Sequence, residues 1–283
     1  MSLIDRLRDC NNANLRTVRP LLHEGATIGW VDPDFACRLT AKPDVFSVCR
    51  DKIIIASSGL GYRALSDKIN LALREIYDDD QSGFGKWCNE MSPVAAQIGH
   101  APLFEVERCA VGPLGVLTRG VHLNGFVRAN GAISMWIAQR ANHIAAQPGK
   151  LDQIVGGFLP AGGDPVKQLT EEAGEEAGIH ADMLRGMAPV GAINFCMKVP
   201  LGVKRGRCLI FDLEMPDHFT PVNKDAEVEK FSLMPPEKVI EILENGQKFK
   251  FDCALIAIDF LIRHKEIASS HPSYHELLKG LRG

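Results

Sequence analysis

Three glutamates in one segment of the chain, Glu172, Glu175 and Glu176, are spaced three and four residues apart. In a helix these spacings place side chains on one face, so the three carboxylates would project together. Carboxylates this close repel one another unless a cation lies between them, and a divalent ion that prefers oxygen ligands fits that role. The pattern favours a site for Mg²⁺ or Mn²⁺, although on its own it is also typical of a solvated acidic helix face.

The residues before the glutamates argue for a site, because a glycine-rich stretch runs into the expected helix. Asp164 suits the N-cap, and Pro165 suits the first helical position, where no amide hydrogen is needed. We expect Gly156-Gly157 and Gly162-Gly163 to form turns that let the backbone approach a ligand closely. One helix face is apolar and should pack on the core; its residues are Val166, Leu169, Ala173 and Ala177.

This segment resembles the Nudix box, whose pattern is G-x5-E-x7-R-E-U-x-E-E-x-G-U with U apolar. The matching residues are Gly157, Glu172, Ala173, Glu175, Glu176, Gly178 and Ile179. Two positions differ, because Gly163 stands where the family usually has Glu and Glu171 where it usually has Arg. Those two side chains pair in the family, so the resemblance implies that this chain lacks a structural ion pair but keeps the metal ligands.

The flanking segments are similar to the thiamin-pyrophosphokinase-related Nudix branch, which carries an extra N-terminal domain of uncharacterised type (DUF4743-like). These segments are Gly120–Val127, Met135–Arg140, Pro148–Gly157, Asp225–Phe231 and Cys253–His264. The resemblance implies a fold of the α/β (α+β) class, a Nudix α/β/α sandwich with a mixed sheet, preceded by a smaller α+β domain. We place the boundary near Thr118, which gives domains at 1–118 and 119–283.

The resemblance also implies roles for the acidic residues. Glu172, Glu176 and the main-chain carbonyl of Gly156 would bind the metal, and Glu175 would bind a second ion or help to deprotonate the attacking water. Glu227 lies in an expected strand two residues before Glu229, so both would point to the same side of the sheet. We expect Glu227 to complete the site from the opposite wall, and the general base stays open among the catalytic candidates Glu175, Glu176 and Glu227.

Five further residues are candidates for substrate binding. Arg140 and Lys150 could neutralise phosphates, Trp136 could stack on a heterocycle, and His122 and Asn124 alternate with apolar residues in a way that could line a pocket. For each there is an alternative structural role, as a surface cation, a core tryptophan or a satisfied core histidine.

The resemblance implies an enzyme, a Nudix pyrophosphohydrolase that cleaves a phosphorus-containing anhydride in a small molecule and releases monophosphates. The implied substrate is thiamin diphosphate or its oxidised analogues. One alternative is a nucleoside diphosphate derivative such as ADP-ribose. Another is a binding or regulatory module that kept the fold and lost activity, which the substitutions at Gly163 and Glu171 make worth considering.

Composition agrees with a small-molecule partner. The 283 residues carry a formal net charge of -3, which excludes a basic nucleic-acid surface spread over the whole molecule. The 8 cysteines show no C-x-x-C spacing, so we expect no structural zinc. Without a secretory or membrane-spanning apolar run, we expect a cytoplasmic protein with no membrane partner, and a homodimer is left open.

Apolar periodicity and turn residues predict the remaining elements. The N-terminal part should contain a helix at Ile4–Asn11, strands at Ala26–Val31 and Val45–Ala56, and a helix at Arg63–Tyr77. Strands at Gly115–Val127 and Ala132–Arg140 should form a hairpin around Asn130-Gly131. The rest should contain strands at Gly206–Leu213 and Glu227–Leu233 and helices at Pro236–Glu244 and Phe251–His264.

Overall fold

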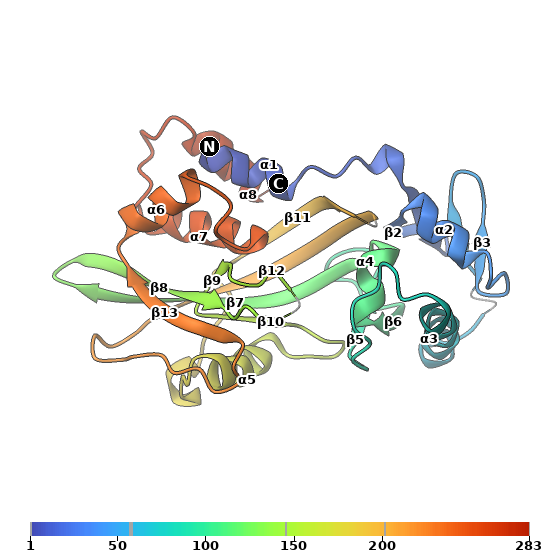
Figure 1. The fold of residues 1–283 in the computed structure, drawn as a ribbon, viewed down its shortest axis with the longest axis horizontal. Coiled ribbons are helices and arrows are strands. Elements are labelled where there is room, and N and C mark those ends of the chain that lie inside the picture. The colour runs from blue at the N-terminus through green and yellow to red at the C-terminus, as the bar shows by residue number, and fades with distance from the viewer. Residues whose placement is uncertain (1, 57–58, 145, 201, 283) are drawn as a thin grey trace.

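A mixed, seven-stranded sheet forms the centre of the C-terminal part of the chain in the computed structural model, which describes residues 2–56, 59–144, 146–200 and 202–282 (Figure 1). Its main path runs in the order β11-β12-β7-β8-β13, with β10 paired to β7 and β9 to β8. Only β12 and β7 are parallel among these pairs of described strands. The strands are β7 (Leu117–Ala129), β8 (Ala132–Arg140), β9 (Leu151–Asp152), β10 (Val155–Phe158), β11 (Gly191–Val199), β12 (Gly202–Glu214) and β13 (Val228–Met234).

Helices cover both faces of this sheet, which confirms the predicted sandwich (Figure 1). Helix α5 (Pro165–Glu176) packs on one face through a core that includes Leu169 and Ala173. The other face carries a larger apolar core beneath α6 (Pro236–Glu244), α7 (Phe251–Arg263) and α8 (Tyr274–Arg282). No helix in the described part of the chain is both long and apolar enough to cross a bilayer.

The N-terminal part has its own core and its own mixed sheet, in the order β2-β1-β4-β3. Helix α3 (Tyr62–Asp79) packs on it and on the two-stranded β5-β6 sheet. The other elements of this part are η1 (Leu15–Thr17), β1 (Arg19–His23), β2 (Ala26–Val31), α2 (Pro33–Leu39), β3 (Phe46–Val48), β4 (Ile53–Ile55), β5 (Met91–Val94), β6 (Phe104–Glu107), η2 (Arg108–Ala110) and α4 (Val111–Leu114).

One N-terminal element packs on the C-terminal core. Helix α1 (Leu3–Cys10) buries Leu3, Ile4 and Cys10 against α7 and α8, and both chain ends lie on that side of the molecule (Figure 1). The division of the chain near Thr118 therefore does not separate all contacts of the two parts, and it stays a prediction.

Local signals predicted most elements well. Strand β2 and helix α6 have the expected bounds, and the β7-β8 hairpin turns at Asn130 and Gly131, whose φ values are 51° and 82°. The single strand expected at Val45–Ala56 is wrong. It is a hairpin of β3 and β4, because the polar residues between the two apolar runs form a tight turn in which the Cys49 amide donates to the Lys52 carbonyl at 2.8 Å.

Candidate active site

Helix α5 positions the three glutamates. Its N-cap is Asp164, whose carboxylate accepts hydrogen bonds of 3.0 and 2.8 Å from the amides at the second and third helical positions, and Pro165 is the first helical residue, as predicted. Leu169 and Ala173 are fully buried against the sheet. Because the apolar face fixes the rotation of the helix, Glu172 and Glu176 are turned toward β10.

The two glycines of β10 allow close approaches of side chains that a Cβ at either position would displace. We expected a turn at Gly156-Gly157, which is wrong because both residues belong to the strand. A Cβ on Gly157 would lie 2.5 Å from Oε1 of Glu172, and a Cβ on Gly156 would lie 2.8 Å from Nδ1 of His122. The two glycines thus admit side chains from opposite faces of the sheet. The amide of Gly156 also donates to Oε2 of Glu176 at 2.8 Å.

Glu176 is the buried member of the cluster, with 6% of its surface exposed. Burial raises its pKa well above the usual range, the hydrogen bond from Gly156 opposes that rise, and the negative charges of Asp152 and Glu172 add to it. A carboxylate in these surroundings is stabilised either by a proton or by a cation placed beside it.

Glu172 is half-buried and accepts a hydrogen bond of 2.9 Å from the Gln168 amide. Burial raises the pKa of Glu172, the Gln168 hydrogen bond lowers it, and the carboxylates of Glu175 and Glu227 raise it again. Glu175 itself is exposed at the surface of the helix. Four carboxylates, three on α5 and one from the segment before Val228, therefore lie around one region.

The donor set fits a divalent cation. Among the described residues, none of these four glutamates lies within 4.0 Å of a lysine, arginine or histidine nitrogen. Unpaired carboxylates at spacings of three and four residues, next to a main-chain carbonyl, provide the oxygen ligands that Mg²⁺ or Mn²⁺ prefers. Glu171, by contrast, points away and pairs with Lys167 at 3.8 Å.

Glu227 reaches the cluster from the opposite side. It lies just before β13 and is exposed, so the strand expected at Glu227–Leu233 begins one residue later, at Val228. A register shift between Val228 and Lys230 also removes the simple alternation that we expected for Glu227 and Glu229. Glu227 nevertheless lines a small hollow together with Glu176 and Arg140.

The two predicted phosphate-binding cations lie in different places. Arg140, at the end of β8, lines the hollow with Glu176 and forms an ion pair of 3.0 Å with Asp152. Lys150 is not brought to the carboxylates, because its ammonium donates to the Gln247 carbonyl in the segment between α6 and α7. The position of Lys150 just before the box does not predict this placement, because a contact almost a hundred residues away directs its side chain.

The other substrate candidates lie within the fold. His122 and Asn124 are 3% and 1% exposed on the face of β7 that α7 covers, and Asn124 donates to Asp212 at 2.9 Å. The structure therefore does not bring them to an open surface. Trp136 is half-buried and packs against the core beneath α5, with its indole N–H buried and without a hydrogen-bond partner among the described residues. Its role in stacking stays a prediction.

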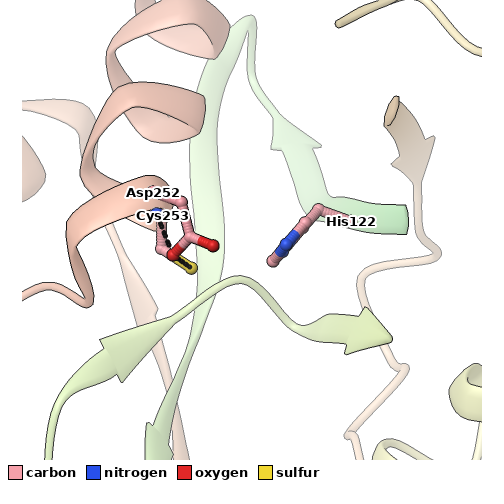
Figure 2. Close-up of side chains that lie close together, drawn as sticks. All are labelled: His122, Asp252 and Cys253. Carbon is pink, nitrogen blue, oxygen red and sulfur yellow. Dashed lines mark hydrogen bonds between the residues drawn. The ribbon is translucent and has the colours of Figure 1, made fainter. Parts of the chain in front are cut away.

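A cluster of buried polar and titratable side chains lies on the far side of β10 from Glu172. His122, Asp252 and Cys253 bring potential ligand atoms within 4.8 Å of one another (Figure 2). Nitrogen, sulfur and oxygen donors can bind zinc, but the Lys250 ammonium already lies 3.4 Å from Asp252 and 3.6 Å from Asp152. Because a lysine supplies the positive charge here, the arrangement is an ion network rather than a metal site. The sequence does not predict this network, because its members come from distant segments.

The N-terminal part contributes Arg108, a residue that the sequence did not single out. Its guanidinium lies 4.6 Å from the centre of the Phe158 ring at the end of β10 and donates to Glu90 at 2.7 Å. The loop that follows β10 is held from the same side, because the Ala161 amide donates to the Met91 carbonyl at 2.9 Å. Residues of the N-terminal part therefore border the region of the carboxylates.

Comparison with known proteins gives matches for both parts of the chain. Residues 2–118 match the family described as a domain of unknown function, DUF4743. The chain is 30% identical to "Nudix hydrolase 20, chloroplastic" of Arabidopsis thaliana over 293 residues, which cover 98% of this chain and 77% of that protein. It is 34% identical to "Nudix hydrolase 24, chloroplastic" of the same plant over 194 residues, covering 69% and 53%. The crystal structure of DR0079 from Deinococcus radiodurans matches with a TM-score of 0.39 at 21% identity, over 50% of this chain and 82% of that chain.

Proposed function

Because this chain belongs to the Nudix hydrolase family, we propose that it hydrolyses the diphosphate linkage of a small molecule with a divalent cation bound between α5 and β10. The observation that supports this most is the group of carboxylates without a basic partner, Glu172, Glu175, Glu176 and Glu227. Membership confirms the predicted resemblance to Nudix hydrolases, and the domain match confirms the extra N-terminal domain.

In this proposal Glu172, Glu176 and the main-chain carbonyl of Gly156 hold the first cation, and Glu175 holds a second. Bound cations neutralise charge on the diphosphate and lower the pKa of a bound water. Gly157 keeps β10 close enough for Glu172 to face the site, and the Gly156 amide fixes the orientation of the Glu176 carboxylate. The chain thereby positions its ligands with one strand and one helix.

Glu227 is the proposed general base. It is exposed, it lines the hollow shared with Glu176, and its backbone is fixed by a hydrogen bond of 2.8 Å from the Ala141 amide to its carbonyl. A carboxylate oxygen of Glu227 would accept the proton of the attacking water while Glu172 and Glu176 serve as ligands. Arg140, at the same hollow, would orient a phosphate.

We infer that the N-terminal part forms one wall of the substrate cleft. Arg108 borders the carboxylates, and the loop after β10 is hydrogen bonded to Met91. For the substrate we propose thiamin diphosphate or an oxidised analogue, which rests on the resemblance of the flanking segments to the thiamin-pyrophosphokinase-related branch. The cation that we propose is Mg²⁺, with Mn²⁺ as a substitute.

The test is release of monophosphate by the purified full-length protein from a panel that contains thiamin diphosphate, its oxidised analogues and ADP-ribose, with Mg²⁺ or with EDTA. We expect turnover of at least one thiamin compound that requires the metal and falls by at least a hundredfold in Glu176→Gln. The matched control is Glu171→Gln on the same helix, which should retain full activity because Glu171 faces solvent and pairs only with Lys167 among the described residues.

Proton abstraction is tested separately with Glu227→Gln and its neighbour Glu229→Gln. The first variant should lose kcat with little change in metal affinity, and the second should behave as wild type. If no compound in the panel gave a metal-dependent product, hydrolysis as the function would be excluded and a binding module would be favoured. Faster turnover of ADP-ribose than of every thiamin compound would exclude the substrate proposal alone.

A further inference from the structure

A second cavity, of about 520 Å³, lies at the edge of the central sheet where α6 meets β8 and β13. Its apolar lining includes Ile137, Met234 and Ile242, and its polar lining includes Gln139 and Gln247. Three lysines complete it: Lys150, Lys230 and Lys248. A cavity of this size with an apolar floor and a few polar groups has the dimensions of a small-molecule site.

This cavity is separate from the carboxylates because it opens on the opposite face of the sheet. Gln139 is paired with Lys230 and Ile137 with Ser232 across the β8-β13 ladder, and residues paired in this way point to the same face. Side chains alternate along a strand, so Arg140, which lines the hollow with Glu176, points to the other face. Lys150 lies on the side of Lys230, not on the side of Glu176.

The charged residues that line the cavity are all positive. No aspartate or glutamate is among the residues that line it, and none of its three lysines forms an ion pair within 4.0 Å in the part of the chain that the structure describes. The Lys150 ammonium is held at the cavity by the Gln247 carbonyl. Three ammonium groups around one concave surface, with no carboxylate within 4.0 Å of them among the described residues, create a positive potential that attracts an anion.

We propose that this cavity binds a small phosphorylated molecule, with its phosphate or diphosphate group among the three lysines and its less polar part on the floor. The site goes beyond the proposed hydrolysis, because no carboxylate that could hold a catalytic metal lines it. It is nevertheless connected to the catalytic face. The Arg140 amide donates to the Lys150 carbonyl at 2.9 Å, and the Gly149 amide donates to the Arg140 carbonyl at 3.1 Å. An occupant that fixes Lys150 therefore also fixes the strand end that carries Arg140.

The experiment is calorimetric titration of the full-length protein with inorganic pyrophosphate, in EDTA so that no metal bridges the ligand to the glutamates. We expect binding that weakens by at least tenfold in the double variant Lys230→Gln/Lys248→Gln, because two of the three positive charges are lost. The matched control is Lys238→Gln on α6, an exposed lysine paired with Glu241 outside the cavity, which should bind as wild type. A second variant, Arg140→Gln, should also retain binding.

Absence of metal-independent binding would overturn the proposal. So would binding that survives in the double lysine variant or is lost in Arg140→Gln, since the anion would then occupy the catalytic face. Circular dichroism of each variant shows that a loss of binding is not a loss of fold. Metal-dependent hydrolysis by the double lysine variant is measured in parallel, so failure of this site is distinguishable from failure of the proposed function.

Discussion

The buried Lys250 ammonium should be one of the main determinants of stability, and its replacement tests the ion network beneath the active site. Its side chain is 16% exposed and lies within 3.6 Å of both Asp152 and Asp252, whose side chains are 6% and 8% exposed. Burial lowers the pKa of Lys250, but the two carboxylates outweigh burial and hold that pKa well above its usual value. Lys250→Met removes the charge, keeps most of the apolar volume and leaves two buried carboxylates short of a partner.

Removing one partner of a buried ion pair typically costs about 3 to 5 kcal/mol. We expect the lower end, about 3 kcal/mol, because Arg140 still lies 3.0 Å from Asp152 in the variant. The pKa of Asp252 reflects the same interaction together with other neighbours. Burial raises this pKa, but Lys250, His122 and Lys204 together lower it from 3.8 to about 2. That net shift corresponds to about 2 kcal/mol of stability.

The pH dependence follows from the sign of that shift. Because the pKa of Asp252 is lower in the folded state than in the unfolded state, its contribution is present above pH 3.8 and is lost as the pH falls toward about 2. Lys250→Met lacks most of this contribution. The difference in the free energy of unfolding between wild type and variant should therefore narrow as the pH falls through that interval.

The assay is urea unfolding followed by tryptophan fluorescence, at neutral pH and at several acidic values. The double variant Lys250→Met/Asp252→Asn should recover part of the loss, since it removes one of the two unpaired charges. Lys238→Met, an exposed lysine paired with Glu241, is the control and should cost less than about 1 kcal/mol. A loss below about 1 kcal/mol in Lys250→Met, or one independent of pH, would refute the argument.

Three further predictions concern the active site. Gly157→Ala should leave the protein folded but lower turnover by roughly a hundredfold, because the added Cβ would displace Glu172. The control Gly174→Ala, at a position with open space around it, should retain activity, and equal rates in the two variants would contradict the prediction. If the N-terminal part binds the substrate phosphate, Arg108→Gln should raise KM by roughly tenfold with little change in kcat. An unchanged KM would show that Arg108 does not contact the substrate. Mg²⁺ at a hundred times its Kd should raise the free energy of unfolding of the wild type by about 2.7 kcal/mol, measured by thermal unfolding. Glu172→Gln should lose most of this stabilisation, and equal stabilisation of the two proteins would place the metal elsewhere.

Local signals in the sequence were sufficient for the helix of the active site. Asp164 and Pro165 mark its start, and the apolar spacing of Leu169 and Ala173 determines which side faces the sheet. The β7-β8 hairpin was equally predictable, since Asn130 and Gly131 suit the positive φ values of a tight turn. In both cases the residues that determine the structure are neighbours in the chain.

The interactions that position side chains across the fold were not predictable in this way. Lys150 was expected beside the substrate phosphates because it precedes the box, yet a carbonyl of Gln247 directs it to the other face of the sheet. Arg108 carries no sequence signal for its place near the carboxylates, because that place depends on how the N-terminal part packs on β10. Such contacts follow from tertiary packing, which the local pattern of a single sequence does not specify.

The missing ion pair of the box shows how tertiary contacts can take over a local role. Glu171 pairs with Lys167 within the helix, and Gly163 has no side chain to pair with it, so the ion pair that the family has between these two positions is absent. The strand that faces the glutamates is instead held from outside the box. Asp152, four residues before Gly156, is fixed by Arg140 and Lys250, and the loop after β10 is fixed by Met91. In the proposed metal site, the placement of Glu172 and Glu176 therefore depends on the buried ion network and on the N-terminal part, two features that lie outside the motif.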